Sequence, residues 1–183
     1  MLKITIPGIE MYDESKNEFS YTKDTTLQLE HSLVSISKWE SRWHKSFIAT
    51  KNKTQAESLD YIRCMVITQN VPDSVYRGIN NEIMEKINTY IDDPMTATTF
   101  SKEQEKSLKT SAHEIITSEL IYYWMIALQI PMECQKWHLN RLLTLINVCN
   151  IKNTPPKKMS KSEIYSKNKA LNAARRAKYH SKG

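Results

Sequence analysis

Residues 32–47 read SLVSISKWESRWHKSF, and this stretch decides the fold class. Its apolar side chains recur every three or four residues: Leu33, Ile36, Trp39, Trp43 and Phe47. A spacing of three and four places side chains on one face of an α-helix, because the helix turns once in 3.6 residues. The stretch therefore predicts an amphipathic helix with one face buried.

The residues before this helix have a different pattern. Ile4-Thr5-Ile6 and Phe19-Ser20-Tyr21 carry β-forming residues at period 2, and residues 13–17 between them are typical of a turn. A third short strand is expected at Thr25–Leu29. Because an isolated hairpin is marginal in water, we expect this hairpin or meander to pack on the helices.

Two more helices are expected directly after residue 50. Thr54-Gln-Ala-Glu57 has the spacing of a capping box, and Leu59, Ile62 and Val66 follow on one face. Asn70–Ser74 breaks the chain. A single helix is then predicted through Ile87, on the four-residue steps of Val75, Ile79 and Ile83, ending at Asp92-Asp93-Pro94.

The second half predicts further helices. Residues 95–109 are rich in Thr, Ser and Lys and are expected to form a loop or lid. A second capping box, Ser111–Glu114, precedes the most apolar helix, expected at 115–129. Its nine-residue apolar run is too short to span a membrane, which predicts a buried helix. Another helix is expected at 132–147, with four inward side chains: Trp137, Leu142, Leu145 and Ile146.

The C-terminal segment is expected to be a separate tail. Residues 150–156 are typical of a linker, and a third capping box at Ser160–Glu163 leads into a helix at 164–179. The sequence thus predicts a mainly α single domain of five to six helices. A small β-hairpin or meander at 1–31 precedes the helical core at 32–151, and a basic helical tail occupies 152–183. Only three glycines occur in the chain, which favours this helical class.

The positive charge is concentrated in the tail. Residues 152–183 hold ten Lys/Arg and one acid, a net +9, whereas residues 1–151 hold sixteen bases and nineteen acids, a net −3. Such a segment attracts nucleic acid or an acidic protein surface; a solubilising tail and a helix ordered by its partner are the alternatives. The basic residues proposed for binding are Lys157, Lys158, Lys161, Arg175, Arg176 and Lys178.

No motif for catalysis or metal binding is recognisable. His113-Glu114 lacks the second histidine of a zinc helix, since position 117 is Thr. Cys134, His138 and Cys149 are interpreted as packing residues because they lack paired ligand spacing. We therefore expect no enzyme, cofactor or metal. Three cysteines without a C-x-x-C pair, and no visible signal peptide, favour a reducing cytoplasm over secretion or a membrane.

Several aromatic residues are candidate anchors for a protein partner. Tyr and Trp bury rigid apolar area and carry one polar group, so they serve in interfaces as well as in cores. Most of these side chains are expected to lie in the core. The candidates are Trp39, Trp43, Tyr122, Tyr123, Trp124 and Trp137.

From about Ser35 to the end, the chain carries several phrases that resemble one known family. They are Tyr61-Ile-Arg-Cys-Met65, Asp93-Pro-Met-Thr-Ala-Thr98, residues 114–126, residues 134–143, Pro155-Pro-Lys-Lys-Met-Ser160 and residues 170–176. In these phrases the chain resembles the tail assembly chaperones of tailed bacteriophages.

The resemblance implies a helical viral protein without catalytic residues that acts in the host cytoplasm during virion assembly. It would bind the tape measure protein, with the major tail protein as a second candidate partner, and it could form a homo-oligomer. Two alternatives stay open. One is a structural virion component, such as a connector or tail-tip subunit. The other is a nucleic-acid-binding regulator that uses the basic tail.

Overall fold

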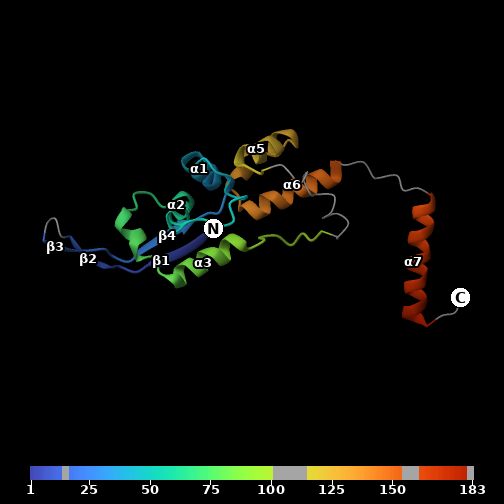
Figure 1. The fold of residues 1–183 in the computed structure, drawn as a ribbon, viewed down its shortest axis with the longest axis horizontal. Coiled ribbons are helices and arrows are strands. Elements are labelled where there is room, and N and C mark those ends of the chain that lie inside the picture. The colour runs from blue at the N-terminus through green and yellow to red at the C-terminus, as the bar shows by residue number, and fades with distance from the viewer. Residues whose placement is uncertain (14–16, 101–114, 154–160, 181–183) are drawn as a thin grey trace. The chain divides into compact units, whose positions relative to one another are not determined.

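A computed structural model describes residues 1–13, 17–100, 115–153 and 161–180 (Figure 1). The chain divides into two compact units, Met1–Ile151 and Lys152–Gly183. The first unit joins an antiparallel β element to a group of helices, and the second contains one long helix. The predicted class, mainly α with a small N-terminal hairpin, is confirmed.

The β element is one long hairpin interrupted in the middle. Strand β1 (Leu2–Ile6) pairs with β4 (Thr25–Leu29), and β2 (Glu10–Asp13) pairs with β3 (Glu18–Tyr21). The strands at 4–6 and 19–21 were expected, but they do not pair with each other, and β2 was not predicted. The partner of β1 is the strand expected as a third one, because the chain folds back at the tip beyond β2.

A glycine allows the two strands of the hairpin to approach at its interruption. A Cβ atom added to Gly8 would lie 2.2 Å from the carbonyl oxygen of Thr22, which no larger residue tolerates. Here the amide of Gly8 donates to Asp24 Oδ1 at 2.7 Å, and the amide of Thr22 donates to the carbonyl of Ile9 at 2.9 Å. These bonds keep the two halves of the hairpin in register.

The hairpin packs against the helices through the inner faces of β1 and β4. Four buried side chains alternate with exposed or half-buried residues and join the core: Ile4, Ile6, Leu27 and Leu29. After helix α2 (Gln55–Met65) the chain runs beside β4, where the amide of Ile67 donates to the carbonyl of Gln28 at 2.8 Å. The half of the hairpin formed by β1 and β4 is therefore part of the core, whereas Tyr12, Phe19 and Tyr21 of β2 and β3 are exposed.

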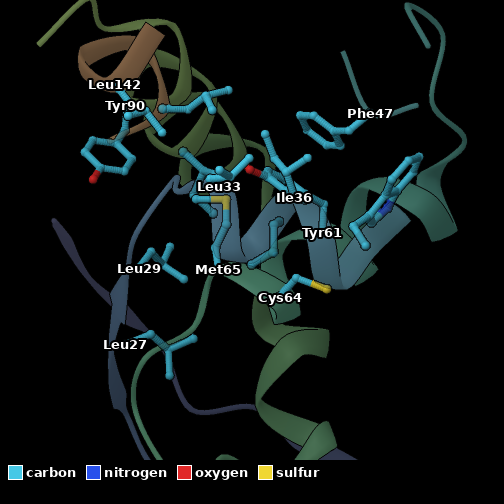
Figure 2. Packing of buried hydrophobic residues seen from close by; sticks show 14 of the residues in the cluster. Leu27, Leu29, Leu33, Ile36, Phe47, Tyr61, Cys64, Met65, Tyr90 and Leu142 are labelled. Carbon is cyan, nitrogen blue, oxygen red and sulfur yellow. The ribbon is translucent and has the colours of Figure 1, made fainter. Parts of the chain in front are cut away.

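Helix α1 (Leu33–Trp43) occupies the middle of the core (Figure 2). The hydroxyl of Ser32 caps its first turn, and the helix ends at His44, which is left-handed with φ 52°. The expected apolar stripe reached Phe47, which lies beyond the helix. Phe47 is nevertheless buried and contacts Trp39 edge-on, because the chain turns back after His44.

The capping box expected before α2 is confirmed. The amide of Glu57 donates to Thr54 Oγ1 at 3.2 Å, and the amide of Thr54 donates to Glu57 Oε2 at 2.7 Å. Both orphan amides at the helix start are thereby satisfied.

The single helix expected around Val75 and Ile87 is wrong, because two helices occupy this segment. A 3₁₀ helix η1 (Asp73–Gly78) is followed by helix α3 (Asn81–Asp92). The side chain of Asn80 accepts from the amide of Ile83 at 2.9 Å and starts α3 anew. Gly78 also packs on β1: an added Cβ would lie 2.8 Å from Ile6 Cγ2. The end at Asp92 is as predicted.

The helix expected at 115–129 is shorter. Helix α5 (Ser118–Ala127) begins after Thr117, whose hydroxyl accepts from the amide of Leu120 at 3.5 Å. Residues 95–100 form no regular element, while 101–109 and the capping box at 111–114 lie outside the described residues.

The helix expected at 132–147 is also divided. A 3₁₀ helix η2 (Met132–Lys136) precedes helix α6 (Leu139–Asn153). The division has a tertiary cause, because residues 138 and 139 bond to the chain before α1 instead of continuing a helix. The amide of Leu139 donates to the carbonyl of His31 at 2.7 Å, and Ser32 and His138 form an isolated antiparallel β-bridge. Since α6 extends to Asn153, the expected linker begins later than residue 150.

The tail contains the predicted helix. Helix α7 spans Lys161–Tyr179, close to the expected 164–179. Residues 154–160, with most of the expected linker and the first residue of the third capping box, lie outside the described residues.

Deleting residues 152–183 should leave a cooperatively folding body. The cut removes only two residues of α6, Lys152 and Asn153, and both are exposed, whereas all core residues lie upstream. We expect the melting temperature to change by less than about 4 °C, which corresponds to about 1 kcal/mol for a domain of this size. Thermal unfolding followed by circular dichroism at 222 nm checks this. A broad, non-cooperative transition would contradict it.

Candidate interaction surfaces

Trp39, one of the six aromatic residues proposed as partner anchors, is a core residue. Its side chain is 0% exposed, and its indole Nε1 donates to the carbonyl of Glu57 at 2.9 Å. It stacks on Trp43 with ring centroids 6.2 Å apart. A partner cannot reach Trp39 in this structure, which corrects the expectation for this residue.

Trp43 and Trp137 are half-buried and already engaged within the chain. The indole of Trp43 donates to Asp60 Oδ2 at 3.0 Å. The guanidinium of Arg141 lies 4.2 Å from the centroid of the Trp137 ring, a cation–π distance. Both rings are therefore only partly exposed and already have partners within the chain, so neither projects freely as an anchor.

Helix α5 is the helix whose burial differs most from the burial that the sequence predicts. Ile121 and Met125 are fully buried on its inner side, but Tyr123 and Ile126 are 64% and 67% exposed. We call Tyr123, Ile126 and the exposed Ala127 the outer face of α5; Leu120, Tyr122 and Trp124 flank it, half-buried. The prediction of a buried helix therefore holds for its inner side and is wrong for its outer face. Figure 1 shows α5 at the outside of the helical group, beside α1 and α6.

Buried hydrogen bonds hold α5 in place. The carboxylate of Glu40 on α1 accepts from two amides, Phe47 at one oxygen and Ser118 at the other, each at 2.7 Å. The hydroxyl of Tyr122, in the middle of the helix, donates to Gln135 Oε1 at 2.9 Å. Because the first residue and the middle of α5 are tied to neighbouring elements, the outer face is a preformed surface.

A small open hollow lies at the start of α5. Its volume is about 280 Å³, and its lining includes Glu40, His44, Lys45 and Glu119. This is at the lower limit of small-molecule pockets, and the hollow is lined by polar and charged residues, without the hydrophobic and aromatic side chains that are typical of such pockets. The hollow is therefore a poor candidate for a ligand site.

The basic residues of the tail divide between described and undescribed parts. Lys157 and Lys158 lie outside the described residues, while Lys161, Arg175, Arg176 and Lys178 are exposed on α7. Every side chain described on α7 is exposed, so these charges are available to a partner.

Sequence reasoning missed a buried pair of histidines. His31 and His138 are 3% and 6% exposed, and their rings meet edge-on with centroids 5.0 Å apart. His31 Nδ1 shares a 2.5 Å hydrogen bond with the hydroxyl of Tyr61, and His138 Nε2 lies 3.0 Å from the carbonyl oxygen of Tyr90. The pair joins the start of α1 to the start of α6. No spacing in the sequence indicates this pairing, because 107 positions separate the two residues.

Burial controls the protonation of this pair. Burial, with a smaller contribution from neighbouring His138 and Lys53, lowers the pKa of His31 to about 3. Burial also lowers the pKa of His138, although Glu30 and Asp93 oppose the shift. Both rings are therefore neutral at pH 7 and inaccessible, which suits a structural tie better than proton transfer to a substrate.

The three residues considered for zinc do not assemble. Cys134 and His138 are buried and Cys149 is half-buried, and no group of three or more His, Cys, Asp or Glu side chains placed to hold a metal occurs among the described residues. His138 instead contacts the rings of His31 and Tyr90.

Within the described ranges, none of the helices combines the length and the apolar character needed to cross a lipid bilayer. Comparison of the chain with protein-family models, with curated proteins and with solved structures gave no match.

Proposed function

We propose that this protein is a bacteriophage tail assembly chaperone that binds the tape measure protein in the host cytoplasm and assists assembly of the tail tube. The outer face of α5 is the surface where it holds this long helical client. The observation that carries the proposal is the exposure of Tyr123 and Ile126 on a helix whose only charged residue is Glu119. The resemblance of the sequence to this family supplies the identity of the client.

The physical character of the face suits a helical client. An amphipathic helix lays its apolar stripe against an apolar surface, which buries both without requiring matched charges. Tyr123 and Ile126 are three residues apart and project on the same side, next to the half-buried Leu120 and Tyr122. Such a face binds its client by removing apolar area from water. The client can therefore be released when another protein offers it a larger apolar surface.

The preformed geometry supports reversible binding. The bonds of Glu40 to Ser118 and of Tyr122 to Gln135 hold α5 at its start and its middle, so little conformational entropy is lost when a client binds. Binding and release need no chemical step, and the proposal includes no cofactor.

Capture of the tape measure protein tests this role. We expect the double variant Tyr123→Ser/Ile126→Ser to retain less than about a tenth of the client, since the loss of two exposed anchors corresponds to at least about 1.4 kcal/mol of binding free energy. Co-expression, affinity purification and quantitative mass spectrometry in about 1 M salt measure it, because apolar contacts survive salt that screens charges.

The matched control is Ile67→Ser, which removes another exposed isoleucine, 52% exposed, on the chain after α2. It should capture the client as well as the wild type, and all variants should melt alike. Equal capture by the α5 variant would overturn the assignment of the face. Recovery of the protein in stoichiometric amounts from purified virions would favour a connector or tail-tip subunit instead.

A further inference from the structure

Helix α7 separates small from polar side chains around its axis. Because successive residues of an α-helix turn by about 100°, the alanines fall together along one side. This small-residue side consists of Ser166, Ala170, Ala173, Ala174 and Ala177. The six bases of α7 all lie on the remaining surface, and with Glu163 as its one acid the helix carries a net +5.

The polar surface has a centre and two flanks. The central row is formed by Lys161, Asn168, Asn172 and Arg175, which follow at i, i+7, i+11 and i+14. One flank carries Lys169 and Arg176, and the other carries Lys167 and Lys178. The central row therefore consists of hydrogen-bonding side chains bordered by cations on both sides.

We propose that α7 is a DNA-binding helix that lies in the major groove of duplex DNA. This groove is about 12 Å wide and admits one α-helix. The two cationic flanks then face the phosphates of the two strands, and the central row faces the base edges. Asn pairs with adenine and Arg with guanine by two hydrogen bonds each, so this row contains the side chains that read a groove.

The arrangement favours DNA over an acidic protein surface. A carboxylate surface approaches a helix from one side and is matched by one basic stripe, whereas the two flanks of α7 lie on opposite sides of a central row that contains two amides. Those amides gain nothing from carboxylates beyond ordinary hydrogen bonds, but they match base edges. Ile164 and Leu171, near the Lys167 flank and each 46% exposed, suit the methyl groups of thymine.

The proposal is independent of the client-binding face, since α7 belongs to the second compact unit and α5 to the first. Duplex RNA is excluded as the preferred ligand by its geometry, because the A-form major groove is too deep and narrow for side chains to read.

Fluorescence anisotropy of the full chain with a labelled duplex of about 20 base pairs tests the proposal. We expect measurable affinity at low salt and a slope of log K against log salt of about −4 to −5, because about five contacted phosphates release counterions. Lys167→Gln/Lys169→Gln should reduce the magnitude of the slope by about 2. Asn168→Ala/Asn172→Ala should leave the slope unchanged but reduce the spread of affinities among duplexes of different sequence.

The control Lys23→Gln/Lys51→Gln removes the same charge from two exposed lysines of the body and should leave the slope unchanged. If this control lowers affinity as much as the α7 variant, binding follows net charge and the proposal fails. Equal competition by polyglutamate would identify an acidic protein partner instead and would overturn DNA binding. Circular dichroism should show unchanged helicity in each variant, since glutamine and alanine are good helix formers.

Discussion

Replacing Trp39 with alanine should lower the free energy of unfolding by about 3–5 kcal/mol, the range measured for large aromatic residues removed from a core. The ring is fully buried, stacks on Trp43 and meets Phe47 edge-on at 5.2 Å. Its removal leaves a cavity where α1 meets the chain around Phe47, and it leaves the carbonyl of Glu57 without its donor. Urea denaturation followed by circular dichroism measures the loss.

Two matched variants separate the causes. Trp39→Phe keeps most of the apolar volume but loses the hydrogen bond, and it should cost less than the alanine variant. Trp43 is the half-buried neighbour, and Trp43→Ala should cost only about 1–2 kcal/mol, because the side chain of Trp43 buries less apolar area on folding than that of Trp39. If Trp39→Ala were as stable as the wild type while losing its partner, Trp39 would be a surface anchor and the described burial would be wrong.

Acid should destabilise the protein steeply below pH 6.5 through His31 and His138. Folding lowers the pKa of both rings, that of His31 to about 3. The unfolded chain therefore binds protons more readily than the folded one. The contribution of the two histidines to the free energy of unfolding is complete above the unfolded pKa of about 6.5, and it is lost as the pH falls from about 6.5 toward 3. Each uncompensated histidine contributes at most about 1.4 kcal/mol per pH unit.

Urea denaturation at pH 7.0, 6.0 and 5.0 measures this slope. The variant His31→Asn/His138→Gln places amides near the hydrogen-bonding nitrogens without a titrating group, and it should show a shallower decline even if its stability at pH 7 is lower. His44→Gln, in an αL position at the end of α1, serves as the control, because this histidine is not buried. An unchanged slope in the double variant would show that other groups cause the acid sensitivity.

Local sequence patterns predicted the elements whose determinants lie within one turn of the chain. The capping box of Thr54 and Glu57 needs only its own four residues, and it forms as expected. The end of α3 at Asp92 and the helix over most of 161–179 likewise follow from neighbouring residues. Periodicity failed where a local cap or a distant backbone bond interrupts a helix, as at Asn80 and at Leu139.

The candidate client face shows the other limit of sequence reasoning. The apolar character of residues 120–128 was evident, and it predicted a buried helix. Whether an apolar helix is covered on one side or on all sides depends on how many elements pack on it, which no property of the helix itself records. The exposure of Tyr123 and Ile126 could therefore not be predicted.

By itself, the sequence determined the mainly helical class, the short N-terminal strands, the separation of charge between body and tail, and the composition of α7, because these depend on residue type and on spacing of a few positions. The tertiary structure alone decided which strands pair, that Trp39 is buried while Tyr123 is exposed, and that His31 meets His138. Each of these depends on contacts between residues far apart in the chain, and the packing of the whole core chooses among them.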